Sequence, residues 1–101
     1  MNEAIESSFL KHSKLILQDG YSATEKIGSL VLSLYNGNAF PFDCSSFRAL
    51  DEHHYAIALE LIDSYYRNGE NDEEFMKLAE DLKEFRKARA EAKAKVLESD
   101  D

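Results

Sequence analysis

Apolar residues recur along the chain at helical spacing, in four segments separated by polar or glycine-containing breaks. Apolar side chains three and four positions apart line one side of a helix, so each segment predicts a helix with a buried face. The first runs from about Glu3 to Gln18, and Gly20 is expected to stop it. The second begins at a capping box, Ser22-Ala23-Thr24-Glu25, and ends at Asn36-Gly37, a pair suited to a left-handed turn.

The third segment carries the widest apolar face. Asp51 is placed to cap it, and Asn68-Gly69 is placed to end it. One side of this helix is formed by Tyr55, Ala58, Leu59, Ile62 and Tyr65 or Tyr66, widened by Ile57 and Leu61. We therefore expect this helix to be the most buried element of the protein.

The fourth segment starts at an acidic capping signature, residues 71–74, and then repeats apolar residues at heptad spacing. These residues are Phe75, Leu78, Leu82 and Phe85. Beyond Phe85 the same positions fall on Arg89, Ala92 and Val96, which bury little apolar surface. We expect packing to end near Phe85, which predicts a helical bundle domain over residues 1–85. Residues 86–101 then form the protruding charged end of the last helix and an acidic tail.

The link between the second and third helices holds a short helical turn, which Asp43 caps and which runs towards Leu50. Eleven Ala and twelve Leu against five Ile, two Val and one Thr favour helix over sheet. The predicted fold is all-α: a small bundle of about four helices plus this turn, with an extended C-terminal helix.

Length and charge narrow the functional classes. A chain of 101 residues builds one small core and leaves no room for a large cleft between two lobes. Its net charge of −8 argues against bulk binding of nucleic acid or anionic membrane. The charge is uneven, because residues 1–82 carry −9, residues 83–97 carry +4 and residues 98–101 carry −3.

Cysteine usage and the N-terminal residues predict a cytoplasmic protein. Cys44 is the single cysteine, so a disulfide framework cannot form within the chain. The first residues are acidic and lack the basic and apolar regions of a secretory signal. The most apolar stretch, residues 27–35, is too short to span a bilayer.

Cys44, His53 and His54 are the residues that most resemble metal ligands or a nucleophile. Adjacent histidines on a helix point about 100° apart, so His53 and His54 do not readily face one ion. A Cys44–His54 nucleophile pair would lack an oxyanion hole, and Asp43 beside the thiol opposes its ionisation. We therefore expect no metal, no cofactor and no enzymatic activity.

A motif in the middle of the chain resembles an uncharacterised family of small bacterial domains. It comprises Leu34-Tyr35-Asn36-Gly37, Phe40, Phe42-Asp43 and Phe47-Arg48-Ala49-Leu50-Asp51. The resemblance covers roughly residues 24–65. It implies a helical domain carried on plasmids, phages or integrative elements, and it implies no particular activity.

These observations favour a non-enzymatic protein-interaction module that docks on a partner protein through an acidic, tyrosine-bearing helical face. Tyrosine is enriched at protein interfaces, and adjacent Tyr65 and Tyr66 cannot both face inward. The candidate interaction residues are Tyr35, Arg48, Tyr65, Tyr66, Glu73 and Glu74.

Two alternative functions and one mode of self-association stay open. The chain could mimic nucleic acid and inhibit a DNA- or RNA-handling enzyme, with residues 70–74 as its densest acidic run. It could instead be a small nucleic-acid-binding regulator that uses the basic residues 83–97, although the overall charge argues against nucleic acid as a partner. The heptad residues of the last helix would also allow a homodimer.

Overall fold

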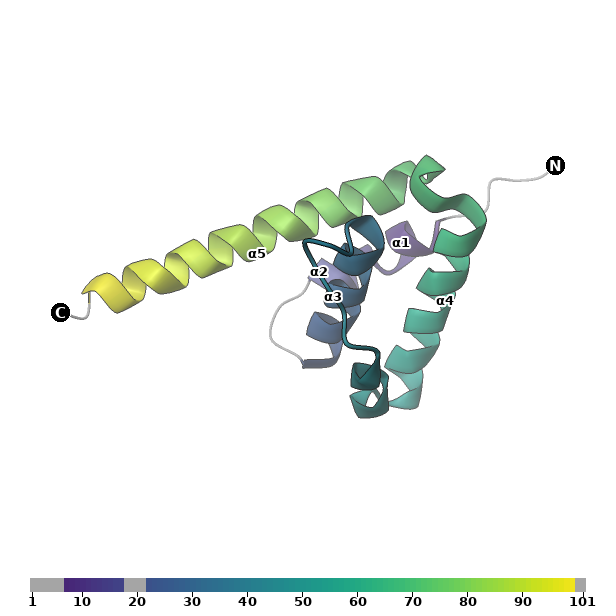
Figure 1. The fold of residues 1–101 in the computed structure, drawn as a ribbon, viewed down its shortest axis with the longest axis horizontal. Helices are drawn as coiled ribbons and strands as arrows, with labels where there is room; N and C mark the ends of the chain where they lie inside the picture. The colour runs from purple at the N-terminus through teal and green to yellow at the C-terminus, as the bar shows by residue number, and fades with distance from the viewer. Residues whose placement is uncertain (1–6, 18–21, 100–101) are drawn as a thin grey trace.

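The protein is a bundle of helices from which the last helix extends (Figure 1). The structure, a computed structural model, describes residues 7–17 and 22–99, and within these ranges it contains no strand. The all-α prediction is therefore confirmed. In chain order the elements are α1 (Ser8–Lys11), α2 (Ser13–Leu17), α3 (Ser22–Tyr35), the 3-10 helix η1 (Cys44–Ala49), α4 (Glu52–Asn68), the 3-10 helix η2 (Gly69–Asn71) and α5 (Glu73–Ser99).

The first predicted helix is two short helices in its described part, α1 and α2, which meet at His12. The Ser7 hydroxyl accepts a hydrogen bond from the Phe9 amide at 3.1 Å and donates one to Asp72 at 2.7 Å, so α1 begins at Ser8. His12 leaves helical geometry where its ring binds Glu60, and this tertiary bond accompanies the break. The predicted bounds at Glu3 and Gln18, the stop at Gly20 and the side-chain cap of Ser22 lie outside the described part of the chain.

Carboxylate caps begin three of the later helices. Asp43 and Asp51 were predicted as caps, and Asp72 is the capping residue within the predicted signature of residues 71–74. Asp43 accepts the Ser45 amide at 3.0 Å, Asp51 accepts the His54 amide at 2.8 Å, and Asp72 accepts the Glu74 amide at 3.0 Å. Each bond satisfies an amide that the first helical turn leaves without a partner. The starts of η1, α4 and α5 therefore follow from short-range chemistry.

The two predicted glycine stops differ. Gly69 has φ of 54°, a left-handed conformation that suits glycine, and α4 ends there as expected. Gly37 has no positive φ, so the predicted left-handed turn after α3 is absent. Asn36 makes the turn instead, because its side-chain oxygen accepts the Ala39 amide at 3.2 Å and its carbonyl accepts the Phe40 amide at 2.9 Å.

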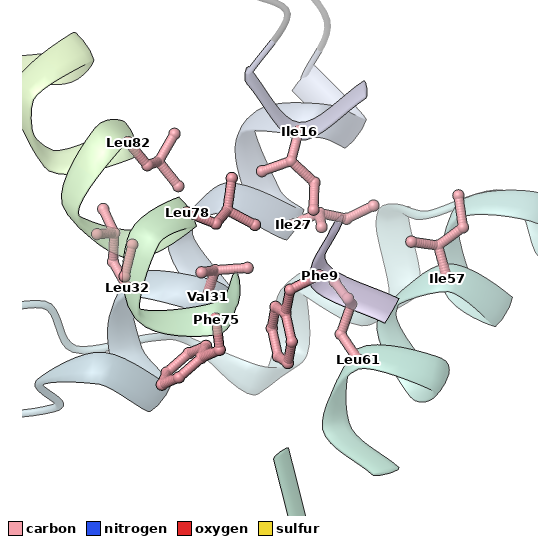
Figure 2. Close-up of a cluster of buried hydrophobic side chains, with 11 residues drawn as sticks. Phe9, Ile16, Ile27, Val31, Leu32, Ile57, Leu61, Phe75, Leu78 and Leu82 are labelled. Atoms are coloured by element: carbon pink, nitrogen blue, oxygen red, sulfur yellow. The ribbon is translucent and has the colours of Figure 1, made fainter. Parts of the chain in front are cut away.

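The core lies where α3, α4 and α5 meet the two N-terminal helices (Figure 2). Phe9 is fully buried and packs against Phe75, with ring centroids 4.8 Å apart. The helix α3 contacts α2, α4 and α5, and this central position makes it the most buried helix in the described chain. The core cluster comprises Phe9, Ile16, Ile27, Val31, Leu32, Ile57, Leu61, Phe75, Leu78, Ala79 and Leu82.

Two predictions for α4 were wrong. The helix buries a different side from the predicted one, and it is not the most buried element. Its buried residues are Ile57, Ala58, Leu61 and Ser64, whereas Leu59 is 45% exposed. The apolar residues of α4 occupy too wide an arc for one contact surface, so the neighbouring helices cover only part of it. The part they cover is the one centred on Leu61, which meets Phe9 and α3.

The helix α5 packs through its first half and then leaves the bundle. Phe75, Leu78 and Leu82 are buried as predicted, and Phe85 is 38% exposed. Contacts with α3 nevertheless continue past Phe85, because the Arg86 guanidinium donates to the Glu25 carbonyl at 2.8 Å and Arg89 pairs with the Glu25 carboxylate at 2.9 Å. Beyond these contacts the helix runs on to Ser99, and the molecule is 61 Å long (Figure 1). In the described part of the chain, no helix combines the length and apolarity needed to cross a bilayer.

Candidate interaction surface

Four apolar residues on α4 form a continuous row that the rest of the bundle covers only in part. Spacings of four, three and four residues place them on one side of the helix. Tyr55 is 43% exposed, Leu59 45% and Tyr66 85%, while Ile62 is half-buried. We call this row, Tyr55, Leu59, Ile62 and Tyr66, the outer stripe.

Aromatic side chains from the preceding link extend the outer stripe at its N-terminal end. Phe47 in η1 lies edge-on to Tyr55, with ring centroids 6.0 Å apart, and Phe42 lies 5.4 Å from Phe47. Both phenylalanines are half-buried. Asp43 caps η1, which carries Phe47, and Asp51 caps α4, which carries Tyr55. The apolar surface therefore spans two elements rather than one helix.

Carboxylates border this surface. Asp51 and Glu52 stand at the start of α4, and Asp63 lies beside the stripe, where it pairs with Arg67 at 2.9 Å. The hydrogen bonds from the His54 amide and the His54 ring lower the pKa of Asp51. The hydroxyl and amide of Ser45 likewise lower the pKa of Asp43. Both groups are therefore ionised at neutral pH. Because Arg67 neutralises Asp63, the negative charge of the border is concentrated at the start of α4, around Asp51 and Glu52.

Of the six residues predicted for an interaction site, Tyr66 lies in the outer stripe, and Tyr65 lies beside it facing inward. The Tyr65 ring packs against Phe75 with centroids 5.2 Å apart, so this tyrosine belongs to the core boundary. Arg48 is exposed on η1, near the aromatic extension. The carboxylate of Asp51, three residues further along the chain, binds the His54 ring.

Tyr35 lies elsewhere, at the contact between the end of α3 and α5. Its hydroxyl donates a hydrogen bond to Glu80, and the Lys83 ammonium stands 5.6 Å from its ring centroid. The bond to the Glu80 carboxylate raises the pKa of Tyr35 and lowers that of Glu80. Tyr35 is therefore engaged within the chain and does not belong to the outer stripe.

Glu73 and Glu74 line a polar depression at the corner between α4 and α5, with a volume of about 690 Å³. Asp63 and Arg67 of α4 and Asp72 line it as well. Asp63 and Arg67 line this depression and also lie at the edge of the outer stripe, so the two surfaces adjoin. The two predicted glutamates and Tyr66 lie on adjoining parts of the surface.

The residues considered for metal or nucleophilic chemistry do not gather. Cys44 is exposed on η1, and the His54 ring binds Asp51 at 2.9 Å. The His53 and His54 rings meet edge to face, with centroids 5.2 Å apart. Among the described side chains, those of residues 7–17 and 23–95, no three His, Cys, Asp or Glu groups are arranged to hold a metal ion.

Sequence reasoning placed the outer stripe in the core and so missed its two N-terminal members, Tyr55 and Leu59, as surface residues. One signal was present. The apolar positions of α4 cover two neighbouring arcs, one through Ile57 and Leu61 and one through Leu59 and Ile62, and a single flat contact buries one arc.

Comparison with known protein families gives a match over most of the chain. The model of a family of unknown function, DUF7673, matches residues 15–92. The match includes the whole motif region, residues 24–65, and extends into the helices on both sides of it. No curated protein and no solved structure matches the chain.

Proposed function

The chain belongs to the DUF7673 family of unknown function, and on this premise we propose that it is a non-enzymatic protein-interaction module. It docks on a partner protein through the outer stripe of α4 and the carboxylates beside it. One observation supports this above all. Three large side chains on one face of one helix reach solvent: Tyr66 is 85% exposed, Leu59 45% and Tyr55 43%. Contiguous apolar surface of this kind marks interaction sites, and tyrosine is enriched in them.

The charges around the stripe specify the class of partner. Residues 1–82 carry −9, and Asp51, Glu52 and Asp63 lie at the edges of the apolar row. Such a border attracts a basic surface and repels an acidic one, which affects association rate and specificity more than affinity. The partner surface is therefore apolar at its centre and basic at its rim.

The biological setting is part of the same proposal. The motif from Leu34 to Asp51 resembles domains carried by bacterial plasmids, phages and integrative elements. We place this module on such an element and its partner in the bacterial cytoplasm. Docking requires no cofactor and no metal.

Photo-crosslinking tests the docking surface. A photoreactive phenylalanine analogue replaces Tyr66 in one protein and Glu84, an exposed residue of α5, in the control protein. Crosslinking in the bacterial host should yield a discrete protein adduct from position 66 and none from position 84. Leu59→Asp in the same protein should reduce the adduct at least tenfold without lowering the melting temperature. Equal adducts from both positions, or an adduct that Leu59→Asp leaves unchanged, would contradict the proposal.

A further inference from the structure

The polar depression at the corner between α4 and α5 is a surface that the proposed function does not use. It lies where α4 ends, η2 turns the chain and α5 begins (Figure 1). Its volume of about 690 Å³ falls in the range of pockets that hold small molecules. The described residues that line it include no member of the outer stripe. What this depression binds is therefore a separate question.

One hydroxyl in its wall lacks a hydrogen-bond partner. Ser64 is only 9% exposed, and it lines the depression from α4. No group in the described part of the chain hydrogen-bonds its Oγ atom. Every fully buried side-chain oxygen or nitrogen among the described residues does have a partner, so this hydroxyl reaches the open space of the depression. A nearly buried hydroxyl is costly to leave unpaired, and a donor placed in the depression would pair it.

Two carboxylates in the walls are uncommitted as well. Glu73 and Glu74 begin α5, and neither side chain has a hydrogen bond or an ion pair with the described residues. Asp72, by contrast, caps α5, and Asp63 pairs with Arg67 at 2.9 Å. Four carboxylates and one guanidinium thus line the depression, with a net charge of −3.

The start of a helix favours carboxylates for reasons of its own. The positive end of the α5 dipole stabilises Glu73 and Glu74 whether or not a ligand is bound. It does not account for the unpartnered Ser64, which belongs to α4. The acceptors on the two helices therefore need a common explanation.

We propose that the depression binds a guanidinium group. Its acceptors are spread over two helices, and in the described part of the chain no three carboxylates converge as a metal ion requires. A guanidinium carries five N–H donors in a planar fork, and a carboxylate accepts two of them side by side. The group can therefore bind a glutamate at the start of α5 and the Ser64 hydroxyl at once. An ammonium concentrates its three donors at one point and spans the depression less well.

This inference goes beyond docking through the outer stripe and does not depend on it. The guanidinium can belong to a free small molecule or to an arginine side chain of a protein. Both present the same donors and the same charge, and the experiment below separates them.

A titration of the isotope-labelled full chain, followed through its amide chemical shifts, measures the binding. The probe is arginine blocked at both ends as its acetyl methylamide. It should cause saturable shifts within residues 63–74, with a dissociation constant on the order of 1 mM for so small a ligand. The same compound built on citrulline replaces the guanidinium with an uncharged urea, and it should bind at least about tenfold more weakly. The lysine compound should also bind more weakly.

Ser64→Ala separates a role in binding from a role in folding. Because the hydroxyl has no partner in the described chain and alanine favours helix, the melting temperature should stay unchanged or rise. Affinity for the arginine compound should nevertheless fall roughly threefold or more. Glu73→Gln combined with Glu74→Gln should lower it at least about tenfold. Glu84→Gln is the matched control, since this exposed residue of α5 lies outside the depression, and it should change nothing.

Shifts that grow without saturating, or a citrulline or lysine compound that binds as tightly as the arginine compound, would overturn the inference. So would a Ser64→Ala protein that loses stability and keeps its affinity. Methylguanidinium identifies the source: affinity equal to that of the arginine compound indicates a free small molecule, and weaker affinity indicates an arginine side chain. Leu59→Asp should leave the titration unchanged, so this inference and the proposed function fail separately.

Discussion

The two apolar sides of α4 carry similar residues and have different surroundings. Ile57 and Leu61 on the inner side are 4% and 0% exposed, whereas Leu59 and Tyr66 on the outer side are 45% and 85% exposed. Both sides follow helical spacing, so apolar pattern alone does not distinguish them. The difference comes from the helices that surround α4, because α1 and α3 contact the inner side. An apolar helix face therefore indicates a contact surface. The contact can be with another helix of the same chain or with another molecule.

The largest expected effect comes from comparing alanine substitutions of two leucines, Leu61 on the inner side of α4 and Leu59 on the outer side. Leu61→Ala should reduce the free energy of unfolding by about 2–5 kcal/mol, because it removes buried methyl groups and leaves a cavity beside Phe9. Leu59→Ala should cost less than about 1 kcal/mol, since much of that side chain already contacts water. Urea unfolding followed by circular dichroism gives both values. If both substitutions reduced the free energy of unfolding equally in a monomeric sample, the two sides of α4 would not differ in burial as described.

The cap at the corner between α4 and α5 comes next in the size of its expected effect on stability. Asp72 accepts the Glu74 and Phe75 amides and the Ser7 hydroxyl. Asp72→Ala should cost about 1–2 kcal/mol, in the upper range for loss of an N-cap. Asp81→Ala is the control: it removes an exposed pair with Lys77 at 3.8 Å and should cost less than about 0.5 kcal/mol. A smaller loss for Asp72→Ala than for Asp81→Ala in thermal unfolding would refute this role.

Glu60 fastens α1 to α4 and makes that contact sensitive to acid. Burial raises the pKa of Glu60, but hydrogen bonds from His12 and Ser8 outweigh burial and lower it below the ordinary 4.5. A carboxylate with a lowered pKa stabilises the fold above its unfolded-state pKa, and this contribution disappears as pH falls through the folded-state pKa. Wild type should therefore be more stable than Glu60→Gln at pH 6, and the difference should shrink below about pH 4.5.

Urea midpoints between pH 3 and pH 7 measure this difference. Glu84→Gln, at an exposed position of α5, serves as the control. A gap between wild type and Glu60→Gln that widens towards pH 3 would have the wrong sign and would reject the assignment.

The smallest effect on stability belongs to the most exposed residue. Tyr66→Ser should change the free energy of unfolding by no more than about 0.5 kcal/mol, because the ring is 85% exposed. Its effect should appear in association, as a weaker adduct in crosslinking from position 55. A Tyr66→Ser protein that is destabilised as much as Leu61→Ala would show that the outer stripe is structural.

Much of the helix plan was readable from short-range signals. Asp43, Asp51 and Asp72 cap the helices that follow them, and Gly69 ends α4 in a left-handed conformation. These signals act over one to three residues, so no knowledge of packing is needed to use them. Gly37 correctly indicated where α3 ends, but the predicted left-handed conformation is absent, because the Asn36 side chain stabilises a different turn.

The candidate surface was harder to predict than the helices. Tyr66 could be picked out because adjacent residues on a helix cannot both face inward, and Tyr65 takes the inward position. Tyr55 and Leu59 could not, since their spacing fits a core as well as a surface. The contacts of Arg86 and Arg89 with α3 were equally hidden. They join residues about sixty positions apart, across a close approach at Gly28.

The amino-acid order by itself determined that this chain is helical and where most helices begin and end, because caps, glycine stops and side-chain spacing act between neighbours. Tertiary structure alone decided which side of α4 would be buried, how the first segment would break and how far α5 would remain attached. Those outcomes depend on which of several apolar arcs finds a partner, and a partner distant in sequence leaves no mark on local spacing. For α4, packing around Phe9 selected the arc through Leu61 and left the arc through Leu59 to solvent.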